Sequence, residues 1–133
     1  MRESSKVGSK LEHYLLKALI KDSFKVEFHK EQILSNTKLQ LDLFLPTMNI
    51  AIEVDGPSHF LPVWGEDSLS KNQKYAKKKS GLIIGKGLKL IRIKQTHDFS
   101  KARASQVYDN LKSILNNNQA FTNSKISIIE IED

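Results

Sequence analysis

Two apolar runs joined by a polar tetrapeptide stand near the middle of the chain, in the sequence LQLDLFLPTMNIAIEVD (residues 39–55). Large apolar residues recur at every second position in both runs, which is the period of a β-strand. The four residues 46–49 between them are short enough for a hairpin loop. The stretch therefore predicts two antiparallel strands, over residues 39–45 and 50–54.

The register of this hairpin brings acidic side chains together. Leu45 would pair with Ile50, and counting outward from that pair places Asp42 opposite Glu53. The Cβ atoms of such partners lie about 4.5–5.5 Å apart, and like charges at that distance destabilise a sheet. Asp55 adds a third carboxylate on the face of Glu53. A divalent cation would offset the repulsion, so these three acids are candidate metal ligands; the alternative is that they line a solvated sheet face.

Helical and strand patterns alternate through the rest of the chain. Apolar residues at helical spacing predict helices over residues 10–21, 67–83 and 100–115, and alternation predicts strands over residues 24–28, 88–93 and 126–131. This mixture favours an α/β fold with a mixed central sheet flanked by helices. The 133 residues are a single-domain length, with a core at 9–115 and a tail, 116–133, that forms either a last strand or an ordered arm.

The composition narrows the classes of function. Because the chain has no cysteine, a disulfide framework, a thiol nucleophile and a cysteine-ligated zinc site are excluded. No apolar run approaches the ~20 residues that span a bilayer, and residues 1–5 lack a signal peptide's apolar segment, so we expect a cytoplasmic protein and no membrane partner. The net charge of +6 favours a nucleic-acid partner, although basic faces also occur in proteins that bind none.

Two charged residues fall within the apolar arcs of predicted helices. Glu12 lies between Leu16 and Leu19 on the helical wheel, so a carboxylate is aimed at the core and needs a partner such as a lysine, a backbone donor or the same metal. Lys79 projects from the inner arc of the helix over 67–83, where it would hold an attacking water and stabilise charge on a phosphate. The alternatives are a Glu12 tip in water and a Lys79 stem that follows the core surface.

The helix over residues 67–83 has a distinct outer arc. Four lysines on that arc, here called the outer lysines, would contact phosphates: Lys71, Lys74, Lys77 and Lys78. The inner arc is predicted to comprise Leu69, Tyr75, Ala76, Leu82 and Ile83. Three residues would either stack on bases or pack within the protein: Tyr75, Trp64 and His97.

The segments LDLFLP (residues 41–46) and IAIEVDGPSHF (residues 50–60) resemble the core of the PD-(D/E)XK nuclease superfamily. The resemblance is to the branch of very-short-patch-repair-like and phage homing endonucleases, and it covers residues 39–94. It implies a restriction-endonuclease-like fold. The string over residues 53–60 also resembles the signature of the RAP domain, a nuclease-like module of organellar RNA-processing proteins.

The resemblance to the nuclease superfamily implies roles for individual residues. Asp42 and Glu53 would hold Mg²⁺, for which Mn²⁺ would substitute. Asp55 stands where the superfamily has a lysine, and Lys79 on the following helix would supply the missing basic group. His59 resembles the histidine that such nucleases use near the scissile phosphate, as a proton donor or to position water.

These expectations lead to functions from different classes. The first is a magnesium-dependent endonuclease that hydrolyses DNA phosphodiester bonds in a bacterial or phage-infected cell, as a homodimer if both strands are cut. The second is a non-catalytic RAP-like module that binds RNA. Many relatives have an acid in the helix near the position of Ala76, and its absence here favours the second function. A third is a structural or inhibitory protein on a nuclease scaffold.

Overall fold

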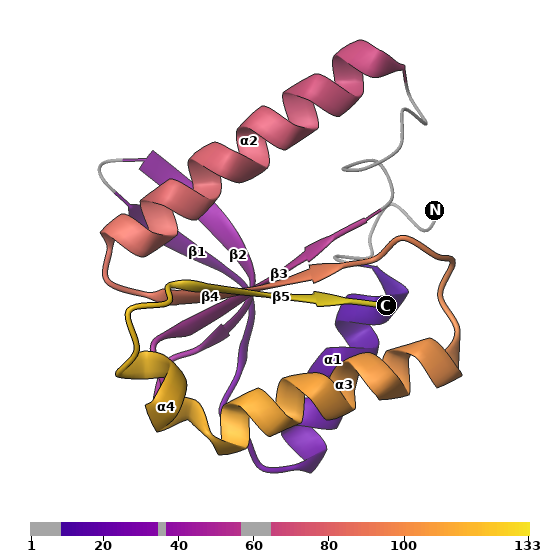
Figure 1. Cartoon of the computed structure of the whole chain (residues 1–133), viewed down its shortest axis with the longest axis vertical. Coiled ribbons are helices and arrows are strands. Elements are labelled where there is room, and N and C mark those ends of the chain that lie inside the picture. Colours follow the sequence, from indigo (N-terminus) through magenta and orange to yellow (C-terminus); the bar gives the residue numbers. More distant parts are fainter. Residues whose placement is uncertain (1–8, 35–36, 57–64) are drawn as a thin grey trace.

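A five-stranded sheet lies between two helical layers in the computed structural model, which describes residues 9–34, 37–56 and 65–133. One face of the sheet is covered by α2 and the other by α1, α3 and α4 (Figure 1). The predicted α/β class, with a mixed sheet flanked by helices, is confirmed. The elements are α1 (Lys10–Lys21), β1 (Glu27–Leu34), β2 (Thr37–Leu45), β3 (Ile50–Asp55), α2 (Glu66–Gly85), β4 (Lys89–Lys94), α3 (Lys101–Asn116), α4 (Asn118–Thr122) and β5 (Ile128–Glu132).

The strands follow their order in the chain, β1-β2-β3-β4-β5. The first three are antiparallel neighbours, whereas β3, β4 and β5 run parallel. The predicted hairpin is confirmed, because Leu45 pairs with Ile50. Within the described residues the backbone pairing of β2 with β3 ends at Leu43 and Ile52, one step before Asp42 and Glu53.

The two faces of the sheet are covered differently. Leucines and isoleucines of β2, β3 and β4 pack with α1 and α3 in the main core, which includes Leu15, Leu43, Ile52, Ile93 and Leu111. A smaller apolar cluster under α2 contains Leu41, Phe44, Ala51, Ile83 and Leu90. Ile83, the fully buried α2 residue of this cluster, lies near the end of that helix, where the partly buried Leu82 also packs against the cluster. The turn before it carries two buried polar residues, Lys79 and Ser80, so the space between α2 and the sheet is polar there.

Serine side chains cap the first turns of two helices. Ser9 caps α1 in a capping box, because its Oγ accepts from the Glu12 backbone N–H at 3.2 Å and the Glu12 carboxylate accepts from the Ser9 backbone N–H at 3.1 Å. Ser100 caps α3 by accepting from the backbone N–H of Arg103 at 3.2 Å. No helix in the part of the chain that the structure describes is long and apolar enough to cross a membrane.

Three local expectations were wrong, and one short helix was missed. The strand predicted over residues 24–28 is β1, which begins at Glu27 and runs on to Leu34, and α4 was not expected. The last strand begins at Ile128, two residues later than predicted. Tyr75 is not packed in the core, as its predicted place on the inner arc implied, because the residue is 55% exposed. The helix α2 diverges from the sheet toward its N-terminal end (Figure 1), so the turns that precede Lys79 have less of the sheet to pack against.

Candidate functional site

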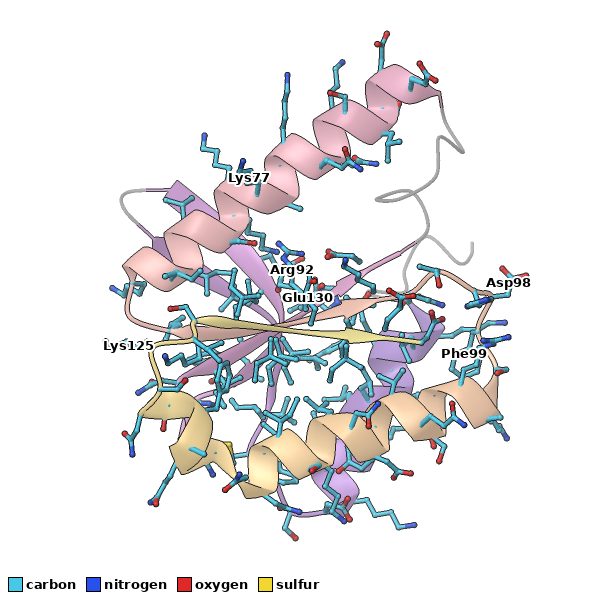
Figure 2. All side chains as sticks on the ribbon, viewed as in Figure 1. Lys77, Arg92, Asp98, Phe99, Lys125 and Glu130 are labelled. Atoms are coloured by element: carbon cyan, nitrogen blue, oxygen red, sulfur yellow. The ribbon has the colours of Figure 1, made fainter. Side chains whose placement is uncertain are left out.

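Polar side chains of α1, α2 and the sheet meet in one cavity of about 170 Å³. Figure 2 shows Arg92 in the space between α2 and the sheet, at this cavity. Five of the six residues predicted to be catalytic line it: Glu12, Asp42, Glu53, Asp55 and Lys79. The sixth, His59, lies outside the described residues, as does Trp64. The fold therefore brings together residues that the sequence placed on separate elements.

Asp42 and Glu53 occupy the point where the backbone pairing of β2 with β3 ends. Oε2 of Glu53 accepts from the backbone N–H of Asp42 at 2.8 Å. In return, Oδ2 of Asp42 accepts from the backbone N–H of Val54 at 2.9 Å. The two carboxylates thus bind the backbone of the opposite strand, which holds both side chains in fixed positions beside each other.

The negative charge of these two acids is only partly balanced by neighbouring cations. Burial raises the pKa of Asp42 to about 7, and the negative charges of Glu53 and Glu12 contribute to that rise. Burial also raises the pKa of Glu53, and Lys79 offsets part of the effect. The acids therefore favour uptake of a cation near neutral pH, either a proton or a metal ion.

Lys79 supplies the one ammonium group among the described residues that line the cavity. Its Nζ lies 2.5 Å from Oε1 of Glu53, and the residue is only 7% exposed. The inner-arc position deduced from the helical wheel agrees with this placement. The outer lysines are all exposed on α2, as their arc predicted.

Arg92 on β4 is a buried residue of the site that the sequence analysis missed. Its Nη1 donates to both carboxylate oxygens of Asp55, at 2.6 and 2.5 Å. Its Nη2 donates to the Ala76 carbonyl at 2.8 Å and to Ser80 Oγ at 2.6 Å, and its Nε also donates to Ser80 Oγ at 2.9 Å. Ala76 and Ser80 flank Lys79 on α2, so Arg92 ties the helix to the sheet around that lysine.

The contacts of Arg92 bear on the metal site predicted from the hairpin. Because both oxygens of Asp55 are bound by one guanidinium, Asp55 is engaged as its ion-pair partner in this structure. The sequence carried a signal that Arg92 needs a partner, although not which one. An arginine inside the apolar run of residues 90–93 needs a partner once both faces of the strand are covered.

His29 on β1 is the second residue that the sequence analysis missed. Its Nε2 lies 2.8 Å from Oε1 of Glu12, and its Nδ1 lies 3.2 Å from Oε1 of Gln40. One potential ligand atom from each of Glu12, His29 and Asp42 lies within 4.8 Å of the others. The predicted strand ended at Phe28, and the sequence analysis assigned no role to His29.

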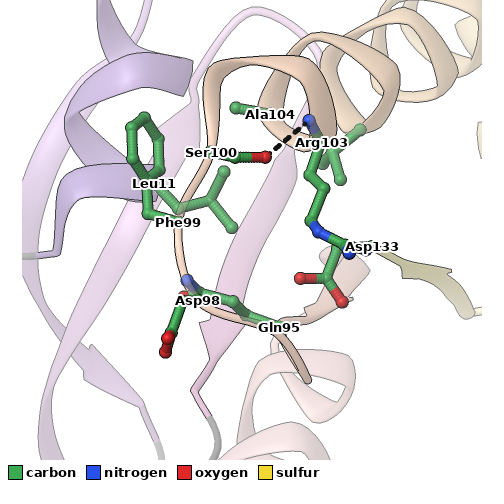
Figure 3. A pocket seen from close by; sticks show the side chains of 9 residues that line it. Leu11, Gln95, Asp98, Phe99, Ser100, Arg103, Ala104 and Asp133 are labelled. Atoms are coloured by element: carbon green, nitrogen blue, oxygen red, sulfur yellow. Dashed lines mark hydrogen bonds between the residues drawn. The ribbon is translucent and has the colours of Figure 1, made fainter.

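The other aromatic candidates lie in different places. Tyr75 is exposed and lines the cavity. His97 is exposed near the C-terminus, where its ring and backbone contact Asp133. Figure 3 shows a separate hollow of about 10 Å³ beside the start of α3, which also includes Asp133. That hollow has room for about one water molecule, so it is no substrate site.

No family model, curated protein or solved structure matches this chain. Any function is therefore inferred from the chemistry of the cavity between α2 and the sheet.

Proposed function

We propose that the chain is a metal-dependent endonuclease that hydrolyses DNA phosphodiester bonds at the cavity between α2 and the sheet. The observation that carries this proposal is the position of Lys79 beside Asp42 and Glu53. A buried ammonium, the buried acid Glu53 and the half-buried acid Asp42 lie in one cavity, and the pKa of Asp42 is raised there. Phosphodiester hydrolysis needs both kinds of group, because negative charge increases on the phosphate as water attacks.

The acids fit a hard divalent cation. Glu12, Asp42 and Glu53 all line the cavity and offer carboxylate oxygens, the ligands that Mg²⁺ and Mn²⁺ accept. A bound cation would also relieve the repulsion that raises the pKa of Asp42. The metal would supply polarisation of a phosphoryl oxygen and a water of lowered pKa. Asp55 is left out of this ligand set because Arg92 engages both its oxygens.

Lys79 would orient the attacking water and stabilise the phosphate. An ammonium has three donors, of which one faces Glu53. The remaining donors are available to a water or a phosphate oxygen at the cavity. Arg92 would maintain this geometry by bonding to Ala76 and Ser80 on both sides of Lys79. In this proposal Asp55 acts through Arg92 as a positioning residue.

The surface of α2 supports DNA as the substrate. The four outer lysines lie on the exposed side of the same helix that carries Lys79. The net charge of +6 favours a polyanion, since each phosphate contact releases counterions. A DNA backbone bound along α2 would pass the edge of the cavity, where Tyr75 is exposed.

One observation favours the alternative of a non-catalytic RAP-like module that binds RNA. Both acids at the end of β3 are already paired with cations, Glu53 with Lys79 and Asp55 with Arg92. Ala76 lines the cavity and adds no acid there. In this reading the charged pairs only hold α2 to the sheet, and the outer lysines bind the nucleic acid.

Cleavage assays separate the two functions. Purified protein is incubated with supercoiled plasmid, single-stranded DNA and RNA, in Mg²⁺, in Mn²⁺ or in a chelator. We expect metal-dependent plasmid nicking by the wild type and by Asp109→Asn, a matched loss of an exposed acid on α3. Asp42→Asn should be inactive. Retention of RNA without cleavage would support the alternative, and no cleavage of any substrate in either metal would refute the endonuclease.

A further inference from the structure

His29, which contacts Glu12 beside the cavity, adds a nitrogen donor to a group of three possible metal ligands with Glu12 and Asp42. Ligand atoms of the three residues lie within 4.8 Å of one another, and Nε2 of His29 is 2.8 Å from Oε1 of Glu12. Ligands about 2.1 Å from one ion in adjacent octahedral positions lie about 3 Å apart. The 2.8 Å between His29 and Glu12 matches that spacing, and an ion held by all three side chains would draw together ligand atoms that lie up to 4.8 Å apart.

Neighbouring residues hold these side chains in place. Oε1 of Gln40 lies 3.2 Å from Nδ1 of His29, so Nδ1 is the ring nitrogen directed away from the acids and Nε2 faces them. The Ser9 backbone N–H bonds Oε2 of Glu12, and the Val54 backbone N–H bonds Oδ2 of Asp42. Each acid thus has one oxygen fixed by a backbone donor, which is how protein groups around a metal orient its ligands.

We infer that Glu12, His29 and Asp42 form a mixed nitrogen and oxygen site that prefers a first-row transition ion such as Mn²⁺ to Mg²⁺. Imidazole nitrogen is a favourable ligand for transition ions, whereas Mg²⁺ strongly prefers oxygen. The side chains of both Glu12 and His29 are largely buried, so the ion would be mostly enclosed by protein. This inference names the class of ion that the proposed endonuclease would use. Its relevance to catalysis rests on that proposed function.

The backbone at His29 guides the choice of variants. Its φ is 51°, in the left-handed region, where asparagine and aspartate are the best tolerated residues other than glycine. His29→Asn therefore removes the imidazole with the least backbone strain. His29→Asp replaces the nitrogen donor with a carboxylate. His97→Asn is the matched control, because His97 is exposed and contacts Asp133 outside the cavity.

The test measures metal binding directly, on protein without a histidine tag. Calorimetry gives the dissociation constants of Mn²⁺ and Mg²⁺ for the wild type and the three variants. We expect the wild type and His97→Asn to bind Mn²⁺ at least ~10-fold more tightly than Mg²⁺. His29→Asn should weaken Mn²⁺ binding by ~10-fold or more and change Mg²⁺ binding much less. His29→Asp should reduce the ratio of Mn²⁺ affinity to Mg²⁺ affinity.

Pulsed electron paramagnetic resonance of bound Mn²⁺ supplies a second readout. A directly bound imidazole gives nitrogen hyperfine coupling, which we expect in the wild type and in His97→Asn but not in His29→Asn. Bound Mn²⁺ without nitrogen coupling in the wild type would overturn the inference, even if His29→Asn failed to fold. Equal Mn²⁺ affinity of the wild type and a folded His29→Asn would do the same.

The outcomes also separate this inference from the proposed function. Nitrogen coupling in a protein that cleaves no substrate in either metal would support the site and refute the endonuclease. Metal-dependent nicking by a protein whose Mn²⁺ has no nitrogen ligand would support the endonuclease and refute the role of His29.

Discussion

Replacing Asp42 by asparagine should stabilise the metal-free protein at pH 8 and leave its stability almost unchanged at pH 4. Asparagine has nearly the shape of aspartate, and its carbonyl oxygen can still accept from the backbone N–H of Val54, as Oδ2 of Asp42 does. The substitution removes a negative charge from a half-buried position beside Glu53 and Glu12. The effect on stability should therefore come mainly from that charge.

The magnitude follows from the pKa of Asp42. Burial raises this pKa from 3.8 to about 7 in the folded protein. One pKa unit corresponds to about 1.4 kcal/mol, so ionising Asp42 lowers the free energy of unfolding by an order of 4 kcal/mol at most. The folded state binds the proton of Asp42 more tightly than the unfolded state does. The free energy of unfolding of the wild type therefore falls progressively as the pH rises from about 4 to about 7. We expect Asp42→Asn to gain about 2–4 kcal/mol at pH 8.

Urea unfolding followed by circular dichroism, in a chelator and at several values of pH, measures this difference. Asp109→Asn on α3 is the control, because it removes an exposed acid without touching the cavity. Saturating Mn²⁺ should reduce the gain, since the wild type is stabilised by the metal that it binds. An Asp42→Asn variant that is no more stable than the wild type at pH 8, or whose gain is the same at pH 4, would refute the reasoning.

Three further predictions concern the cavity and the outer lysines of α2. Lys79→Met should reduce turnover by roughly a hundredfold with little loss of DNA binding. Lys78→Met should instead weaken DNA binding and spare single-turnover cleavage at saturating protein. If the two variants behave alike in both assays, Lys79 is not catalytic. Arg92→Met should lower the free energy of unfolding by about 3–5 kcal/mol, because it leaves Asp55 buried without the guanidinium that binds it. In urea titrations, the double variant that adds Asp55→Asn should recover part of that loss. DNA affinity should fall steeply with salt, and neutralising one outer lysine should reduce the log–log slope by about one; an affinity independent of salt would argue against a nucleic-acid partner.

Periodic patterns in the sequence determined most of the secondary structure and two side-chain directions. The alternation through residues 39–55 gave the hairpin and its Leu45–Ile50 register. Helical spacing placed Glu12 and Lys79 on inner arcs, and both are buried. These predictions held because each depends on only a few neighbouring residues and on which side of an element is apolar.

Tertiary structure alone decided how the charged groups are paired. Asp55 and Arg92 are 37 positions apart and meet because β3 and β4 are parallel neighbours with α2 packed over them. His29 reaches Glu12 from a strand whose extent was mispredicted, at a residue with a left-handed backbone that no local pattern signals. Local periodicity predicts which face of an element a side chain occupies. Its partner depends on the neighbouring element in space, so the pairs that define this cavity emerged only with the complete sheet.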